Sequence, residues 1–224
     1  MPRTARIVGA GYLHHIIQRG NNRQAVFFDD EDRRVYLKLL KKYTDECNCK
    51  IKAYCLMNNH IHLLLIPQHD NSLSKTMQKL SLRYTQYINS KYKRTGRLWE
   101  CRFHSSVVDR ERYLWSVCRY IERNPIRAKI VNEPVKYKWS SAKVNTSLDQ
   151  QDNLVEPIWQ DHLEREEYIK FLNQPDNKDE IGRIRKSTFG GIPMGTDEFL
   201  KDIAKTLGVI IKIRPRGRPR KMKK

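Results

Sequence analysis

Two histidines separated by one residue are the first feature of this sequence that could do chemistry. His60 and His62 lie in the segment 57–66, where two asparagines precede a run of apolar and β-favouring residues. Side chains alternate between the faces of a strand, so both histidines share one face while Ile61 lies on the other. Two imidazoles about 7 Å apart at Cα can converge on one divalent cation. The alternative is an ordinary amphipathic strand with half-exposed polar residues, and the spacing alone does not decide between them.

A tyrosine and an asparagine four residues apart form a second pair, in a helix predicted over residues 111–124. At 100° per residue, Tyr120 and Asn124 share one flank of the predicted buried stripe. Each has a plain structural explanation by itself: a tyrosine at the border of the core, and a helix C-terminal residue before Pro125. Taken with His60 and His62, a nucleophile and an amide oxygen complete the parts of a metal-assisted phosphodiester site.

The composition indicates a polyanionic partner. The chain of 224 residues carries 44 Lys and Arg against 25 Asp and Glu, a formal net charge of +19. Nucleic acid is the first candidate for such a basic chain, although a ribosome-associated or polyphosphate-binding protein would have the same excess. The five cysteines, odd in number and irregularly spaced, predict reduced core residues rather than a disulfide framework. With no apolar run of about 20 residues and no signal-peptide pattern, we expect a cytoplasmic protein without membrane contact.

Hydrophobic periodicity and turn residues predict how the first 145 residues fold. Strand and helix patterns alternate along the chain, and the asparagines at 58–59, which tolerate left-handed backbone, suit a tight hairpin turn. Runs in this order predict an α+β, ferredoxin-like sandwich with a central antiparallel sheet packed on helices. The predicted elements are strands at 12–19, 50–57, 60–66 and 98–108, and helices at 31–47, 72–92 (capped by Ser72) and 111–124.

The sequence changes character after residue 145, which predicts three domains or segments: 1–145, 146–211 and 212–224. A polar linker opens the second, a C-terminal extension in which we expect one helix within 155–173 and a short helix capped by Thr196. The tail 212–224 holds eight Lys or Arg and two prolines, a composition that cannot bury a core. Its Arg-Gly-Arg-Pro sequence resembles an AT-hook, an extended segment that enters the minor groove; the alternative is a basic tail without sequence preference.

Several segments in this order resemble one family, the REP-associated tyrosine transposases among the single-tyrosine HUH (IS200-like) transposases. The resemblance covers roughly residues 8–145 and rests on the segments 18–23, 57–65, 96–99 and 119–128. It implies that Tyr120 is the nucleophile that forms a 5′-phosphotyrosine with single-stranded DNA. It also implies that His60, His62 and Asn124 hold one Mg²⁺ or Mn²⁺, and that the substrate is a palindromic hairpin cleaved in its flanking strand.

Exposed basic residues are candidates for holding that DNA, chiefly through phosphate contacts that position it. We predict this role for Arg19, Arg23, Lys79, Arg83, Arg97, Arg102, Arg123 and Arg127, and for Arg214, Arg216 and Arg218 of the tail. The sequence leaves open whether the protein acts as a monomer or a homodimer.

Two other functions compete with that of a transposase. One is a non-catalytic regulator that binds nucleic-acid hairpins, and the presence of all four candidate site residues argues against it. The other is a different HUH nuclease, a relaxase or replication initiator. In those enzymes paired tyrosines or a third histidine are common, and the single Tyr120 followed by Asn124 argues against them.

Overall fold

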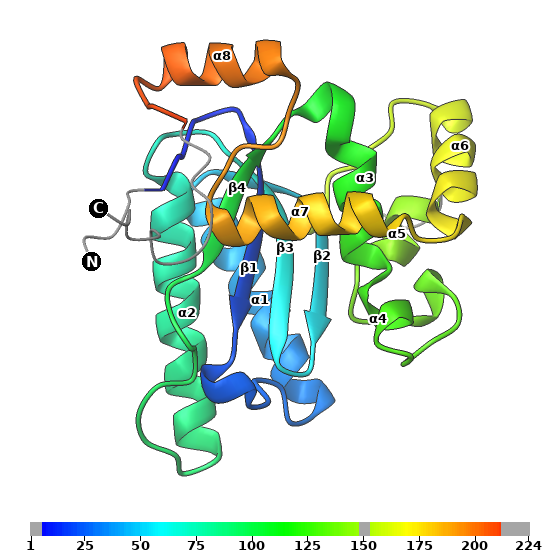
Figure 1. Ribbon diagram of the computed structural model, residues 1–224. Helices are drawn as coiled ribbons and strands as arrows, with labels where there is room; N and C mark the ends of the chain where they lie inside the picture. Colours follow the sequence, from blue (N-terminus) through cyan, green and yellow to red (C-terminus); the bar gives the residue numbers. More distant parts are fainter. Residues whose placement is uncertain (1–5, 148–152, 212–224) are drawn as a thin grey trace, which may run out of the picture.

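A four-stranded antiparallel sheet lies at the centre of the computed structural model, which describes residues 6–147 and 153–211 (Figure 1). Its strands are β1 (Leu13–Arg19), β2 (Cys49–Met57), β3 (His60–Pro67) and β4 (His104–Val108), in the order β2-β3-β1-β4. The two inner strands, β1 and β3, pair Ile17 with His62 and Arg19 with His60. This pairing fixes which residues of the two strands lie side by side.

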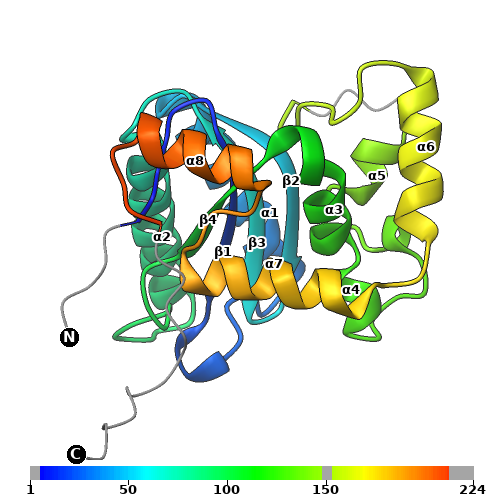
Figure 2. The same cartoon turned by 45° about the horizontal axis from the view of Figure 1, so that its top comes forward.

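Helices cover both faces of the sheet. Helices α1 (Asp30–Glu46) and α2 (Ser72–Lys91) pack on one face, and α3 (Arg110–Glu122) and α7 (Lys178–Gly190) cross the other (Figures 1 and 2). Strand β1 shows the alternation, because Gln18 contacts Ser81 of α2 whereas His15 contacts Thr188 of α7. The order β-α-β-β-α-β with this sheet confirms the predicted ferredoxin-like sandwich.

The strand alternation in β3 is as predicted. Ile61, Leu63 and Leu65 are fully buried on the side of α1 and α2, while His60 and His62 lie on the opposite face. Asp29 caps α1 through a capping box with Asp32. Ser72 is instead the first residue of α2, and its hydroxyl accepts a hydrogen bond from the amide of His69. The buried strand face and the helix starts therefore follow from local sequence to within a residue.

Three predicted features differ in the structure. The fourth strand covers only 104–108, and in the segment before it Trp99 forms an isolated bridge with Gly20, the residue after β1. Helix α3 ends at Glu122, and Asn124 begins a further short helix, α4 (Asn124–Arg127), because Pro125 is tolerated in a first turn, where no amide hydrogen is needed.

The third difference is the hairpin turn at residues 58–59, which is tight but uses no left-handed backbone. Met57 pairs with His60, as a two-residue turn requires, yet neither asparagine is among the described residues with positive φ. The turn is instead hydrogen-bonded to another loop: the main-chain carbonyl of Asn58 accepts from the amides of Val26 and Phe27. The turn is therefore held by the preceding loop rather than by its own backbone conformation.

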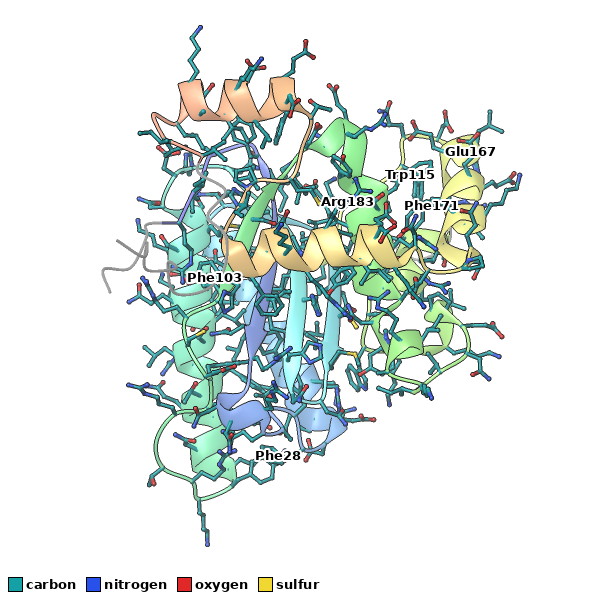
Figure 3. The ribbon with its side chains drawn as sticks, in the orientation of Figure 1. Phe28, Phe103, Trp115, Glu167, Phe171 and Arg183 are labelled. Atoms are coloured by element: carbon teal, nitrogen blue, oxygen red, sulfur yellow. The ribbon has the colours of Figure 1, made fainter. Side chains whose placement is uncertain are left out.

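The rest of the chain packs against this sandwich. The remaining elements are the short 3-10 turns η1 (Asn21–Arg23) and η2 (Pro134–Lys136) and the helices α5 (Ala142–Thr146), α6 (His162–Asn173) and α8 (Asp197–Thr206). Helix α8 is capped by Thr196 as predicted. Trp115 of α3 and Phe171 of α6 lie 6.3 Å apart between ring centroids (Figure 3). No helix in the ranges 6–147 and 153–211 is long and apolar enough to cross a membrane.

A buried carboxylate joins α3 to α5 and α6. Glu122 accepts hydrogen bonds from Ser141 (2.6 Å), Asn145 (2.7 Å) and Tyr168 (2.7 Å), and burial raises the pKa of its carboxyl. A buried polar group is tolerated when its hydrogen bonds are satisfied, as they are here by three donors. These bonds hold α3, and with it Tyr120, against the following helices.

A buried histidine on the face of the sheet covered by α1 and α2 predicts that the folded state is destabilised by acid. His14 contacts the carbonyl of Gly9 through Nε2 (3.2 Å), and burial lowers its pKa from 6.5 to about 4. Below about pH 6.5 the ring is protonated in the unfolded state but stays neutral in the folded state. The free energy of unfolding therefore falls by about 1.4 kcal/mol for each pH unit between the two pKa values. We expect His14→Gln, which retains a donor for Gly9, to reduce this slope by that amount. Urea unfolding of both proteins at neutral pH and at about pH 5 measures it, and equal slopes would contradict the assignment.

Candidate active site

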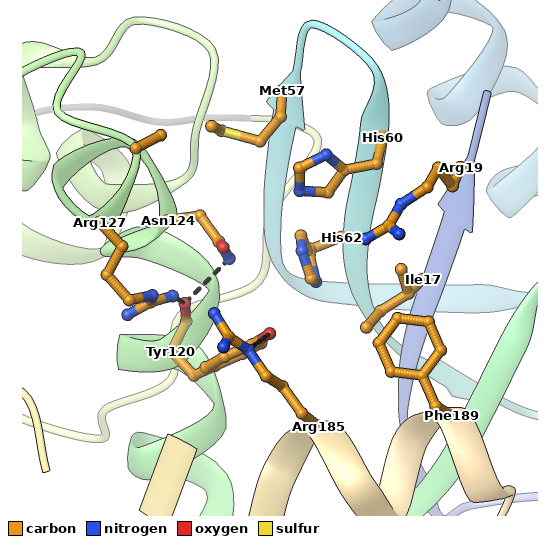
Figure 4. Close-up of a pocket in the computed structure, with 11 residues that line it drawn as sticks. Ile17, Arg19, Met57, His60, His62, Tyr120, Asn124, Arg127, Arg185 and Phe189 are labelled. Atoms are coloured by element: carbon orange, nitrogen blue, oxygen red, sulfur yellow. Dashed lines mark hydrogen bonds between the residues drawn. The ribbon is translucent and has the colours of Figure 1, made fainter. Parts of the chain in front are cut away.

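A pocket of about 450 Å³ opens on the face of the sheet that α3, α4 and α7 cover (Figure 4). All four residues for which the sequence predicts chemistry line it, two from strand β3 and two from the end of α3 and the start of α4. The full lining comprises Ile17, Arg19, Met57, His60, His62, Tyr120, Asn124, Arg127, Ala128, Arg185 and Phe189. Residues from distant parts of the sequence therefore meet in one cavity.

The two histidines present the same ring atom to the pocket. Nδ1 of His60 lies 2.7 Å from the side-chain oxygen of Asn59, and Nδ1 of His62 lies 3.1 Å from Nε2 of His15. Nε2 is the nitrogen that remains for a ligand on each ring. Burial lowers the pKa of His60 to about 4, helped by Arg19 and Arg185, and lowers that of His62 well below 6.5. Both imidazoles are therefore neutral at neutral pH, the form that binds metal ions.

Tyr120 lies beside His15 of β1 and His62 of β3. Its ring meets those of His62 and His15 edge to face, each at 5.5 Å between centroids. Nε of Arg185 donates to the phenol oxygen over 3.4 Å. The ring is 4% exposed, yet it lines the pocket, so the phenol is not sealed in the hydrophobic core.

Asn124 turns its side-chain oxygen away from its own backbone. Its Nδ2 donates to the carbonyl of Tyr120 at 3.0 Å (Figure 4) and to that of Ile121 at 3.2 Å, which fixes the orientation of the amide. Oδ1 is then the atom available to a ligand in the pocket. Because Asn124 begins α4 one turn after Tyr120, the same break in the helix positions both side chains.

Three arginines give the pocket a positive lining. The Arg127 guanidinium lies over the Tyr120 ring, 4.6 Å from its centroid, and Arg19 and Arg185 lie on other walls. A concave surface lined by one sign of charge attracts a ligand of the other sign. Arg185 and Phe189 are site residues that the sequence did not predict, because α7 itself was not predicted; the only signal was a short basic run at 183–186.

The other predicted DNA-binding residues are dispersed. Arg123 is buried, with Asp176 at 2.8 Å, and Lys79 and Arg83 lie on α2, on the far side of the sheet from the pocket. Arg23 is exposed at the end of η1, and Arg97 and Arg102 are exposed in loops. Arg214, Arg216 and Arg218 lie outside the described residues. Contacts between any of these residues and DNA remain predictions.

The candidate metal ligands are not an acidic or cysteine-rich cluster. Within the described part of the chain, no group of three or more His, Cys, Asp and Glu side chains is placed to hold a metal ion. The pocket offers instead two imidazoles and one amide oxygen.

The fold and the pocket define a protein class: a ferredoxin-like domain in which a histidine pair on the sheet faces a tyrosine on a helix. This chain belongs to the IS200-like transposase family, whose sequence model matches residues 10–124, just over half of its length. The matched range ends at Asn124 and so contains both histidines and Tyr120. No curated protein matches the chain.

One solved structure supports the same fold. The chain is similar to a REP-associated tyrosine transposase bound to a REP hairpin, with a TM-score of 0.58 and 16% sequence identity over 73% of this chain and 93% of that one. It also matches, with a TM-score of 0.38 and 20% identity, a candidate transposase from Deinococcus radiodurans R1, over 55% of this chain and 97% of that one. At such identities, the first match supports the fold alone.

Proposed function

We propose that this transposase cleaves and rejoins single-stranded DNA beside hairpin sequences through a covalent bond between Tyr120 and a 5′-phosphate. The observation that carries the proposal is the meeting of Tyr120, Asn124, His60 and His62 in one positively lined pocket. The hairpin substrate is supported by the REP hairpin in the structurally similar transposase.

The cleavage step exchanges one ester for another. The phenol oxygen of Tyr120 attacks the phosphorus, forming an O–P bond while the bond from phosphorus to the 3′-oxygen breaks. The phenol proton is lost, and the departing 3′-oxygen gains one, so the products are a 5′-phosphotyrosine and a free 3′-hydroxyl. Attack by a 3′-hydroxyl on the phosphotyrosine reverses the exchange and rejoins DNA without a nucleoside triphosphate.

The surrounding residues orient these groups. Arg185 contacts the phenol oxygen, and Arg127 packs over the ring, so that they fix the tyrosine. With Arg19 they also supply positive charge beside the negative phosphodiester, where preorganised donors stabilise developing charge. These side chains bind the phosphate, hold the nucleophile and offset charge in the transition state.

The donor set fits a divalent cation such as Mg²⁺ or Mn²⁺. Each of the three side chains makes its hydrogen bonds through one polar atom and leaves the other available. Nδ1 of each histidine and Nδ2 of Asn124 are hydrogen-bonded, which leaves Nε2 of His60, Nε2 of His62 and Oδ1 of Asn124 for the ion. Neutral imidazoles and an amide oxygen are ligands that such ions accept. When bound there, the ion would polarise the phosphoryl oxygens as a Lewis acid.

A hairpin with single-stranded flanks, labelled on one side or the other of the cleavage site, tests the proposal. Incubation with Mn²⁺ followed by denaturing electrophoresis should yield a protein-linked product that carries the label from the 3′ side, together with a free 3′-hydroxyl fragment. A protein that shifts the hairpin in a native gel but forms no adduct with any divalent cation would instead be a hairpin-binding regulator.

The basic tail adds a separable prediction. Removing residues 212–224 takes away eight positive side chains, so DNA affinity should fall and the dependence of log K on log salt should become shallower. The expected change in slope is about 0.7 to 0.9 for each phosphate that the protein no longer neutralises. Fluorescence anisotropy across a salt series measures it. A truncated protein with the full-length slope would exclude a role for the tail in binding the backbone.

A further inference from the structure

A chain of buried hydrogen bonds runs from His62 to helix α7. Nε2 of His15 meets Nδ1 of His62 at 3.1 Å, and Nδ1 of His15 meets the hydroxyl oxygen of Thr188 at 2.8 Å. The side chains of all three residues are almost completely inaccessible to solvent. His15 and Thr188 are not among the pocket-lining residues, and their hydrogen-bonded link to the site runs through His62; His15 also packs edge to face on Tyr120.

A carbonyl of the helix backbone beside Thr188 favours one direction for these hydrogen bonds. The Thr188 hydroxyl donates its single proton to the carbonyl of Ile184, 2.9 Å away. With that proton directed at the carbonyl of Ile184, the Thr188 oxygen accepts from Nδ1–H of His15 at 2.8 Å and from the hydroxyl of Ser106 at 3.3 Å. With Nδ1 of His15 protonated, its Nε2 is the acceptor, and Nδ1–H of His62 is the donor. The proton of His62 is thereby held on Nδ1, and Nε2 keeps its lone pair.

We propose that His15 and Thr188 are positioning residues that hold His62 in the Nδ1–H tautomer, with Nε2 ready to bind a cation in the pocket. The inference rests on the proposed function in giving His62 a cation as ligand. Fixing the tautomer of a metal-binding histidine through its other nitrogen typically affects metal affinity by 10- to 100-fold. Helix α7 lies wholly beyond the family-matched residues 10–124, so the site depends on a segment outside that match.

His60 provides an internal comparison, because its tautomer is set without α7. Its Nδ1 donates to the side-chain oxygen of Asn59, whose own amide nitrogen donates to the carbonyl of Arg23 at 3.0 Å. A change at Thr188 should therefore alter the tautomer of His62 but not that of His60. If Thr188 only packed between α7 and the sheet, changing it would not alter the tautomer of His62 while leaving that of His60 unchanged.

Nitrogen-15 NMR of the histidine rings in the metal-free protein reads the tautomers directly. We expect both His15 and His62 of the wild type to carry their proton on Nδ1. Thr188→Val keeps the shape but removes the acceptor, so His15 and His62 should lose their single tautomer and Mn²⁺ affinity should fall about 10- to 100-fold. Thr188→Ser should restore both. Ser106→Ala, which removes only the second donor to Thr188, should leave both unchanged.

The outcomes separate this inference from the proposed function. A wild-type spectrum with the proton of His62 on Nε2 would overturn the inference. This test needs no variant, so it holds even if Thr188→Val does not fold. A Thr188→Val protein with wild-type tautomers and wild-type Mn²⁺ affinity would also overturn the inference. If the tautomers are as expected but the wild type forms no DNA adduct, the proposed function fails while the tautomer assignment stands. If the adduct forms and Thr188→Val is unaffected, only the inference fails.

Discussion

Tyr120→Phe should abolish the covalent DNA adduct, lowering strand cleavage by about 10³-fold or more, because it removes the attacking oxygen while keeping the ring. The ring contacts with His62, His15 and Arg127 need no hydroxyl, so the pocket should keep its shape. Among the described residues, the substitution removes the long hydrogen bond that Arg185 donates to the phenol oxygen. Hairpin affinity and thermal stability should therefore stay close to those of the wild type.

Tyr113→Phe is the matched control, since Tyr113 lies on the same helix but outside the pocket. It should cleave at the wild-type rate. Quantifying adducts in a denaturing gel alongside native-gel affinities separates chemistry from binding. An adduct that persists at full yield in Tyr120→Phe would assign the nucleophile to another residue.

Replacing either His60 or His62 should cause a large loss of Mn²⁺ affinity. His60→Ala and His62→Ala each delete one of three candidate metal donors, so we expect Mn²⁺ affinity to fall at least about 100-fold, more than for a residue that acts through a ligand. Cleavage should fall with it. Isothermal titration with Mn²⁺ measures the binding without DNA or catalysis.

His69→Ala is the control for that experiment, because His69 is exposed just after β3 and outside the pocket. It should bind Mn²⁺ as the wild type does. Equal Mn²⁺ affinity in all four proteins would place any metal elsewhere and remove the histidines from the proposed ligand set.

The sequence predicted those parts of the fold whose signals are local. The alternation in β3 placed His60 and His62 on one face, and helical spacing placed Tyr120 and Asn124 on one flank; the structure brings both pairs to one pocket. The αβ order and antiparallel sheet were predictable for the same reason. Each inference used residues that are close in sequence.

Features that depend on distant packing were missed. Helix α7 contains Gly182 and few apolar residues, so its sequence shows no clear buried stripe, yet it lies across β1 and β4 with Ile184 and Thr188 buried. Arg185 was missed with it. The strand sequence around His15 gave no sign that this histidine bonds to His62, because their pairing depends on the register of β1 against β3.

The proposed chemistry is tested most directly by identifying the residue that becomes linked to DNA. The adduct formed on a hairpin with single-stranded flanks would be digested with nuclease and trypsin and analysed by mass spectrometry. We predict that the peptide of residues 120–123 carries a nucleotide through its 5′-phosphate on Tyr120. A nucleotide on any other residue, or unmodified peptide from protein that still binds the hairpin, would contradict the tyrosine mechanism.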